Sequence, residues 1–135
     1  SMFPSQRDEA AAWRDTVAAY DGYIIVTAEY NNSFPAVLKN ALDHVYAEWA
    51  HKPVAFAAYG SVGGVRAVQH LRHVAIELQM APIRASVHIP GGDFMPVMMG
   101  QKQLGDLPYL PGSVDAMVDQ LAWWAAALHQ ARAAA

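Results

Sequence analysis

Apolar residues follow two patterns along the chain, short continuous runs and longer stretches with helical spacing. Three runs, at residues 23–27, 54–59 and 83–89, predict strands, and the first two are apolar on both faces, as in parallel strands covered by helices on both sides. The third run is less apolar, so we expect it nearer a sheet edge. Apolar residues three and four positions apart predict helices over 6–20 and 35–47, from Gly64 to the break at Ala81-Pro82, and over 113–132.

This alternation of helices and strands predicts a doubly wound α/β fold. Ligands bind such sheets at the carboxyl ends of the strands. Two loops are expected there, residues 28–34 after the first strand and residues 60–64 after the second, named below the asparagine loop and the glycine loop. Residues 90–111 are rich in Pro and Gly and predict a long loop, which suggests a function or a contact with a partner.

Composition narrows the class of protein. The chain has 135 residues, of which 54% are hydrophobic and 16% charged, so we expect one folded domain over residues 1–135 rather than disorder. Because the chain lacks Cys, disulfide scaffolds and thiolate metal sites are excluded. The net charge of −3 argues against nucleic acid as a partner. No apolar run suggests a membrane span or a signal peptide, and we expect a cytoplasmic protein.

The two loops carry the residues best suited to binding. Glycines at 60, 63 and 64 allow backbone to approach a flat ligand, and the helix that follows offers free N–H groups. A tight strand-to-helix turn explains these glycines equally well. Tyr30 with Asn31 and Asn32 offers an aromatic face and amide groups, which suit a planar heterocycle with imide edges. The alternative is that the asparagines only form a turn before the next helix.

Several charged and imidazole side chains have simpler interpretations. His70 and His73 have helical spacing that a metal site can use, but no third ligand accompanies them, so we favour a solvated helix face and expect no metal. Arg66 either faces solvent or reaches the phosphate of a nicotinamide dinucleotide. Lys39 and Asp43 are spaced for an exposed ion pair.

The segment TAEYNNSFPAVLKNALD at 27–43, followed by Lys52-Pro53 and by YGSVGG at 59–64, resembles the NADPH-dependent FMN reductase family. This is the flavodoxin-like group that includes azoreductase-type and quinone-reductase-type flavoproteins. The family pattern runs Pro-Glu-Tyr-Asn, Ser, Pro and then Leu-Lys-Asn-Ala, and Ala28 stands here where the family has Pro. The resemblance covers residue 21 to about 90 and implies a flavodoxin-like three-layer αβα fold with a parallel sheet.

The resemblance also implies FMN as the cofactor and NAD(P)H as the co-substrate. The implied activity is an oxidoreductase that passes a hydride from NAD(P)H through FMN to a quinone, an azo dye or a similar acceptor. Since the flavin carries this chemistry, no catalytic residue is implied. The residues implied to lie along the isoalloxazine ring are Glu29, Tyr30, Asn31, Asn32, Gly60, Ser61, Gly63 and Gly64.

One departure from the family affects both fold and function. The family begins with a strand, a phosphate-binding loop, a helix and a second strand, and none of these is expected in this sequence. We therefore expect about three strands, equivalent to the family's third, fourth and fifth, with FMN binding weak or absent. The alternative function is a non-catalytic, cofactor-free oligomeric protein, either a truncated or a degenerate paralogue.

In either case we expect a homodimer or homotetramer, because the first strand would have an uncovered edge. The expected contact surfaces are the helix over 35–47 with Trp49, and the loop over 91–111. Trp123 and Trp124 are further candidates.

Overall fold

The computed structural model of the chain describes residues 8–135, with side chains from Ala10 onward. The expected first helix therefore extends at its start beyond the described residues. The elements, in chain order, are α1 (Asp8–Ala18), β1 (Tyr23–Ala28), α2 (Ala36–Asp43), the 3-10 helix η1 (Ala47–Trp49), β2 (Pro53–Gly60), α3 (Val65–Glu77), β3 (Ala81–Pro90), α4 (Gly91–Met98), the 3-10 helix η2 (Leu104–Asp106) and α5 (Leu110–Ala133).

The three strands form one parallel sheet in the order β1-β2-β3. This confirms the expected α/β fold with a three-strand parallel sheet, and β3 lies at an edge of it as predicted. Ala28 at the end of β1 pairs with Tyr59, and Gly60 at the end of β2 pairs with Pro90 of β3. Because these strands end side by side, the segments that follow them meet at one end of the sheet.

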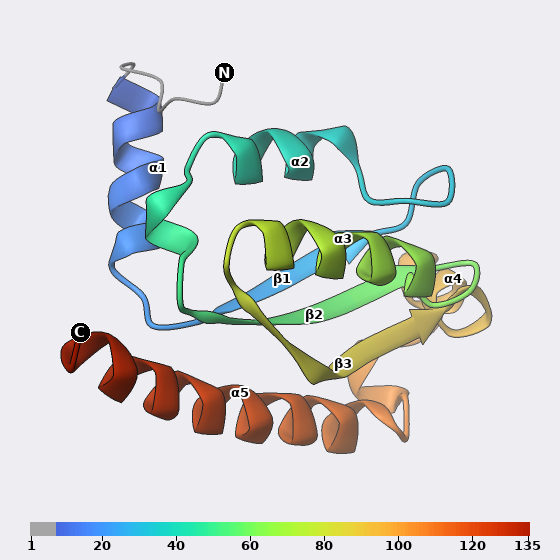
Figure 1. The fold of residues 1–135 in the computed structure, drawn as a ribbon. Coiled ribbons are helices and arrows are strands. Elements are labelled where there is room, and N and C mark those ends of the chain that lie inside the picture. Colours follow the sequence, from blue (N-terminus) through green and yellow to red (C-terminus); the bar gives the residue numbers. More distant parts are fainter. Residues whose placement is uncertain (1–7) are drawn as a thin grey trace.

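Helices cover the sheet on both sides, as Figure 1 shows, with α2 and α3 on one side and α5 on the other. Each side has its own buried cluster of apolar side chains. The larger cluster joins Phe56 of β2 to Leu71 of α3 and Leu42 of α2. The smaller one joins Ile83 and Val87 of β3 to residues of α5. The two helical layers that the continuous apolar runs predict therefore cover β2 on both faces. For β1 the prediction is wrong on one face, because Ile24 and Val26 are exposed on the side of α5.

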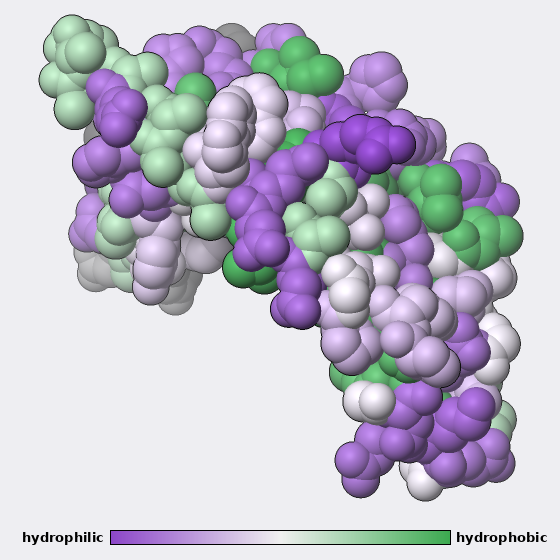
Figure 2. Space-filling view, turned by 90° about the horizontal axis from the view of Figure 1, so that it is seen from below, coloured by the Kyte–Doolittle hydropathy of each residue, from purple (hydrophilic) through white to green (hydrophobic). Residues whose placement is uncertain are grey.

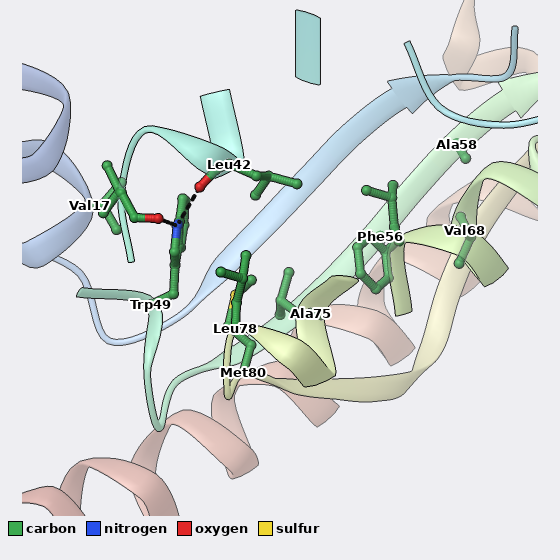
Figure 3. Close-up of a cluster of buried hydrophobic side chains, with 12 residues drawn as sticks. Val17, Leu42, Trp49, Phe56, Ala58, Val68, Ala75, Leu78 and Met80 are labelled. Carbon is green, nitrogen blue, oxygen red and sulfur yellow. Dashed lines mark hydrogen bonds between the residues drawn. The ribbon is translucent and has the colours of Figure 1, made fainter. Parts of the chain in front are cut away.

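Trp49 belongs to the larger core, so the expectation that it lies on a subunit surface is wrong. Its indole Nε1 donates hydrogen bonds to the carbonyls of Leu42 (3.2 Å) and Val45 (3.0 Å), and its ring packs edge-on against Tyr23 at 4.9 Å. Figure 3 shows Trp49 beside Val17 and Leu42, at one end of the row of buried side chains. The helix expected over 35–47 ends at Asp43, which lets the chain turn and bring Trp49 back toward the sheet.

The long loop expected over 90–111 is also wrong in part, because α4 and η2 lie within it. Phe94 of α4 stacks on Tyr59 at the end of β2, with ring centroids 4.4 Å apart. Tyr109 donates a hydrogen bond to the carboxylate of Asp93 at 2.8 Å. These contacts hold α4 against the strand ends, although its sequence contains Gly and Pro. Helix α5 then begins at Leu110, three residues earlier than expected.

Strand β1 is an outer strand, and its side facing away from α2 and α3 is exposed. Val26 is 70% exposed, and Ile24 beside it on the same face is also exposed. On this side α5 packs on β2 and β3. Figure 2 shows the surface from the α5 side, where the outline is concave and hydrophobic and hydrophilic residues are interspersed. No helix of residues 8–135 is long and apolar enough to cross a membrane.

Candidate functional site

The asparagine loop and the glycine loop touch each other at the ends of β1 and β2. The backbone N–H of Glu29 donates to the carbonyl of Tyr59 at 3.0 Å, which extends the strand pairing by one residue. A Cβ atom built on Gly60 would lie 3.1 Å from the Cβ of Glu29. The structure therefore brings together the two loops that carry all eight expected flavin-binding residues.

The asparagine loop forms a tight hairpin at its tip. Tyr30 and Ser33 pair through two backbone hydrogen bonds of 2.8 and 3.0 Å, and Asn31 and Asn32 between them have φ values of 49° and 71°. Positive φ at both central residues is typical of a type I′ turn, which Asn tolerates well. The asparagines thus make the turn and remain exposed, as does the ring of Tyr30, which is 62% exposed. Both interpretations of this loop fit the same conformation.

The glycine loop is a closed turn that leads into α3. The N–H of Gly63 donates to the carbonyl of Gly60 at 2.9 Å, and Gly63 and Gly64 both have positive φ, at 76° and 70°. A Cβ on Gly64 would lie 2.5 Å from the Cβ of Ala58, closer than any side chain can be placed. Gly64 is therefore required by packing as well as by conformation.

The end of β3 supports the glycine loop from its other side, a contact that the sequence analysis did not identify. His88 Nδ1 lies 2.7 Å from the carbonyl oxygen of Gly63, and its Nε2 lies 2.8 Å from the hydroxyl of Ser86. The N–H of Gly91 donates to the carbonyl of Ser61 at 3.4 Å. Residues of β3 and the first residue of α4 therefore fix the backbone conformation of the glycine loop.

Two side chains of α3 contact the asparagine loop. Arg66 Nε lies 2.5 Å from Glu29 Oε1, and the Glu29 side chain is only 3% exposed. His70 Nδ1 lies 2.8 Å from the hydroxyl of Ser33. Arg66 is exposed, as one expectation held, and is also paired with Glu29, which neither expectation included. His70 is exposed, as the solvated interpretation predicts, and in addition contacts Ser33. Residues 8–135 contain no cluster of three or more His, Asp or Glu side chains placed to hold a metal ion.

These positions divide the eight expected residues into three groups. The first is the three glycines, of which Gly63 and Gly64 are buried and Gly60 is partly buried. Tyr30, Asn31, Asn32 and Ser61 are exposed at the strand ends, where a flat molecule can reach them. The carboxylate of Glu29 is turned inward, and its Oε2 is buried without a hydrogen-bond partner. Glu29 therefore supports the loop through its side chain, and it can face a ligand only through its backbone.

Comparisons with known proteins agree with this architecture. The family profile described as NADPH-dependent FMN reductase matches residues 2–93. An NAD(P)H-dependent FMN reductase of Schizosaccharomyces pombe is 36% identical over 108 residues, covering 75% of this chain and 54% of the relative. The corresponding enzyme of Saccharomyces cerevisiae is 40% identical over 82 residues, covering 60% of this chain and 43% of the relative.

A quinone reductase of Escherichia coli is 38% identical over 73 residues, covering 50% of this chain and 39% of the relative. The chain thus spans about half the length of the curated relatives it matches. Among solved structures, the flavoenzyme FerB of Paracoccus denitrificans, an NAD(P)H:(acceptor) oxidoreductase, matches with a TM-score of 0.63. That match has 22% identity and covers 87% of this chain and 69% of FerB, which shows a shared fold. With the family match over residues 2–93, the chain belongs to the NADPH-dependent FMN reductase family.

Proposed function

We propose that the chain acts as a flavin-dependent NAD(P)H oxidoreductase, passing a hydride from NAD(P)H through FMN to a quinone or azo acceptor. The observation that carries the proposal is the contact between the asparagine loop and the glycine loop at the ends of β1 and β2. Relatives named as FMN reductases, a quinone reductase and an NADPH azoreductase support this class of reaction.

The exposed groups of the site suit a flavin ring. In the glycine loop, Gly63 and Gly64 are buried and Gly60 is partly buried, so the part that a planar ring can reach is the exposed turn at Ser61 and Val62. Tyr30 offers an exposed aromatic face, and the amides of Asn31 and Asn32 can both donate and accept hydrogen bonds at an imide edge. When bound, FMN supplies the redox chemistry, and the residues of this chain bind and orient its ring.

We propose that residues 1–135 taken alone bind FMN weakly. The family's phosphate-binding loop has no counterpart in the elements of residues 8–135. Hydrogen bonds to a charged phosphate contribute about 1.5–3 kcal/mol each, so several missing bonds weaken binding by orders of magnitude.

The test is an FMN titration of the purified chain, followed by visible absorption after gel filtration. Tyr30→Ala should remove the residual binding, whereas Tyr20→Ala, an exposed tyrosine beside the end of α1, should not. NADH or NADPH oxidation with a quinone acceptor should then follow the fraction of FMN bound. Equal FMN affinity in the wild type and Tyr30→Ala would show that the site lies elsewhere.

A second candidate, a cofactor-free oligomeric protein, is favoured by the exposed apolar face of β1. Val26 and Ile24 lie exposed on an outer strand, and Trp123 of α5 is 67% exposed. We propose that a second copy of this chain covers this surface in a homodimer or homotetramer. Light scattering should give at least twice the mass of the 14.7 kDa chain, and Val26→Lys should lower it. A dimer that never retains FMN would favour this second candidate.

A further inference from the structure

We propose that Arg66 and His70 are positioning residues, which together fix the tip of the asparagine loop relative to the glycine loop. The consequence for flavin binding rests on the proposed function, whereas the mechanical role can be tested without any ligand. Neither residue needs to touch the ligand for this role, because each acts through a residue of the asparagine loop.

The spacing of the contacts carries the first step. Arg66 and His70 are four residues apart on α3 and therefore lie on one face of the helix, about one turn apart. Their partners Glu29 and Ser33 are also four residues apart, one at each end of the hairpin. Helix α3 thus holds the asparagine loop at both ends, with Tyr30 and the two asparagines between the two contacts.

The Arg66 contact is the stronger of the two because it neutralises a buried carboxylate. The Glu29 side chain is only 3% exposed, and its carboxylate forms an ion pair with Arg66. Arg66 pairs with Oε1 of this carboxylate, and Oε2 is buried without a hydrogen-bond partner. A buried carboxylate that loses its cation is strongly unfavourable. Removing Arg66 should therefore drive Glu29 toward water and move the loop that carries Tyr30.

The His70 contact fixes the opposite end and tolerates a change of charge. A serine hydroxyl can donate or accept, so Ser33 can pair with Nδ1 whether that nitrogen carries a proton or not. Ser33 is also the residue whose backbone closes the hairpin onto Tyr30. Loss of this contact should loosen the tip, with a smaller effect than loss of the Arg66 ion pair.

The same helix connects these contacts to the glycine loop. Helix α3 begins at Val65, directly after Gly64, and Arg66 is its second residue. The strand pairing through Glu29 fixes the base of the asparagine loop beside the glycine loop, and α3 fixes its far end through Ser33. A flat ligand that lies along both loops requires the distance between them to be constant. The contacts of Arg66 and His70 with the asparagine loop keep this distance constant.

Hydrogen exchange of the backbone amides tests the mechanical role in the wild type, Arg66→Ala, Arg66→Lys and His70→Ala. His73→Ala is the matched control, since His73 is exposed on the same helix and takes part in none of the hydrogen bonds of the described side chains. Arg66→Ala should speed exchange at Tyr30 and Ser33 by at least about tenfold while leaving Phe56 in β2 unchanged. Arg66→Lys should retain part of the protection from exchange at Tyr30 and Ser33, because lysine keeps the positive charge. Exchange at Tyr30 and Ser33 equal to wild type in Arg66→Ala would overturn the proposal.

A double-mutant cycle separates the ion pair from general damage. In a Glu29→Gln background the buried charge is gone, so adding Arg66→Ala should change exchange at Tyr30 much less than it does alone. Fully additive effects would overturn the pairing as the cause.

FMN titration of the same variants gives the second readout. Arg66→Ala should weaken FMN binding by about tenfold and alter the visible circular dichroism of the bound flavin, and His73→Ala should do neither. Wild-type protein that binds no FMN would overturn the proposed function, while the exchange result still decides the positioning role.

Discussion

The ammonium group of Lys52 lies 3.2 Å from the hydroxyl oxygen of Tyr23, and the two side chains together close the end of α1. Lys52 is buried and donates to the carbonyls of Val17 (3.4 Å) and Ala18 (3.3 Å), and Tyr23 donates to Val17 at 2.8 Å. The last carbonyls of a helix have no partner within the helix. Residues that precede or begin two strands satisfy them here, so this cluster ties α1 to the sheet.

Replacing Lys52 by Met should destabilise the fold by about 1–3 kcal/mol, because the buried carbonyl of Val17 and the partly buried carbonyl of Ala18 each lose a donor. Urea denaturation measures the change. Lys39→Met is the control, since Lys39 makes an exposed ion pair with Asp43 at 3.0 Å, worth less than about 0.5 kcal/mol. Equal effects of the two substitutions would contradict a structural role for Lys52.

Stability should fall as the pH rises from 10 to 12. Burial raises the pKa of Tyr23 from 10.0 to about 12, so in this range the folded chain keeps a phenol proton that the unfolded chain loses. The contribution is complete below pH 10 and is lost as the pH approaches 12. It amounts to about 2 kcal/mol for this partly buried group. Urea denaturation between pH 9 and 12 should show the fall, and Tyr23→Phe should reduce it.

Two other groups affect the same range and set the controls. Burial lowers the pKa of Lys52 from 10.5, so its contribution rises with pH up to about 10.5, opposite in sign to that of Tyr23. The pKa of Tyr109 is also raised to about 12, by desolvation and by Asp93. Tyr109 is present in the wild type and in Tyr23→Phe and makes none of the hydrogen bonds of Tyr23, so its contribution cancels in the difference. Lys52 contacts Tyr23, but its contribution rises with pH and therefore cannot produce the fall. A difference that stays constant from pH 9 to 12 would contradict the assignment to Tyr23.

Much of the fold follows from the hydrophobic pattern because its strands are apolar on both faces. The runs at 23–27 and 54–59 became the parallel strands β1 and β2, and the weaker run became the outer strand β3. Helix α4 was missed because Gly91, Gly92 and Pro96 disfavour a helix locally. The packing of Phe94 on Tyr59 outweighs that preference, and no local pattern reports a contact over such a separation.

The candidate site was predictable in its loops and not in their support. The family resemblance identifies the two loops, and the carboxyl ends of neighbouring parallel strands lie side by side. Together they predict that the two loops meet. The pairs Arg66–Glu29 and His70–Ser33 each join residues 37 positions apart. They form because α3 runs beside the asparagine loop, a geometry that periodicity within one segment does not contain. The buried position of the Glu29 side chain could not be predicted for the same reason, because it depends on the contact with Arg66.

Trp49 should be among the most costly residues to truncate. Trp49→Ala should destabilise the fold by about 3–5 kcal/mol, since it removes a fully packed ring from the larger core. Trp49→Phe retains most of the ring but leaves the carbonyls of Leu42 and Val45 without the indole donor, which costs about 1–3 kcal/mol. Thermal and urea unfolding measure both. Trp123→Ala, at an exposed position of α5, should change stability by less than about 0.5 kcal/mol in the monomer.

Two Gly→Ala substitutions should have opposite signs. At Gly64, φ is +70° and a Cβ would lie 2.5 Å from Ala58 Cβ and 3.0 Å from the backbone nitrogen of Tyr59. Conformational strain and overpacking together predict a loss of about 2–5 kcal/mol. At Gly112, within α5, a Cβ meets nothing within 4 Å, and Ala should stabilise the helix by about 0.5–1 kcal/mol.

Urea denaturation of both variants, with FMN titration of Gly64→Ala, relates the shape of the glycine loop to its proposed role. Since Gly64 connects β2 to α3 through this loop, a shift at this position should displace Arg66 as well and loosen its contact with Glu29. Stability and FMN binding should therefore fall together. A Gly64→Ala protein as stable as wild type would mean that the loop adapts freely, and such a loop cannot define a fixed surface for a flat ligand.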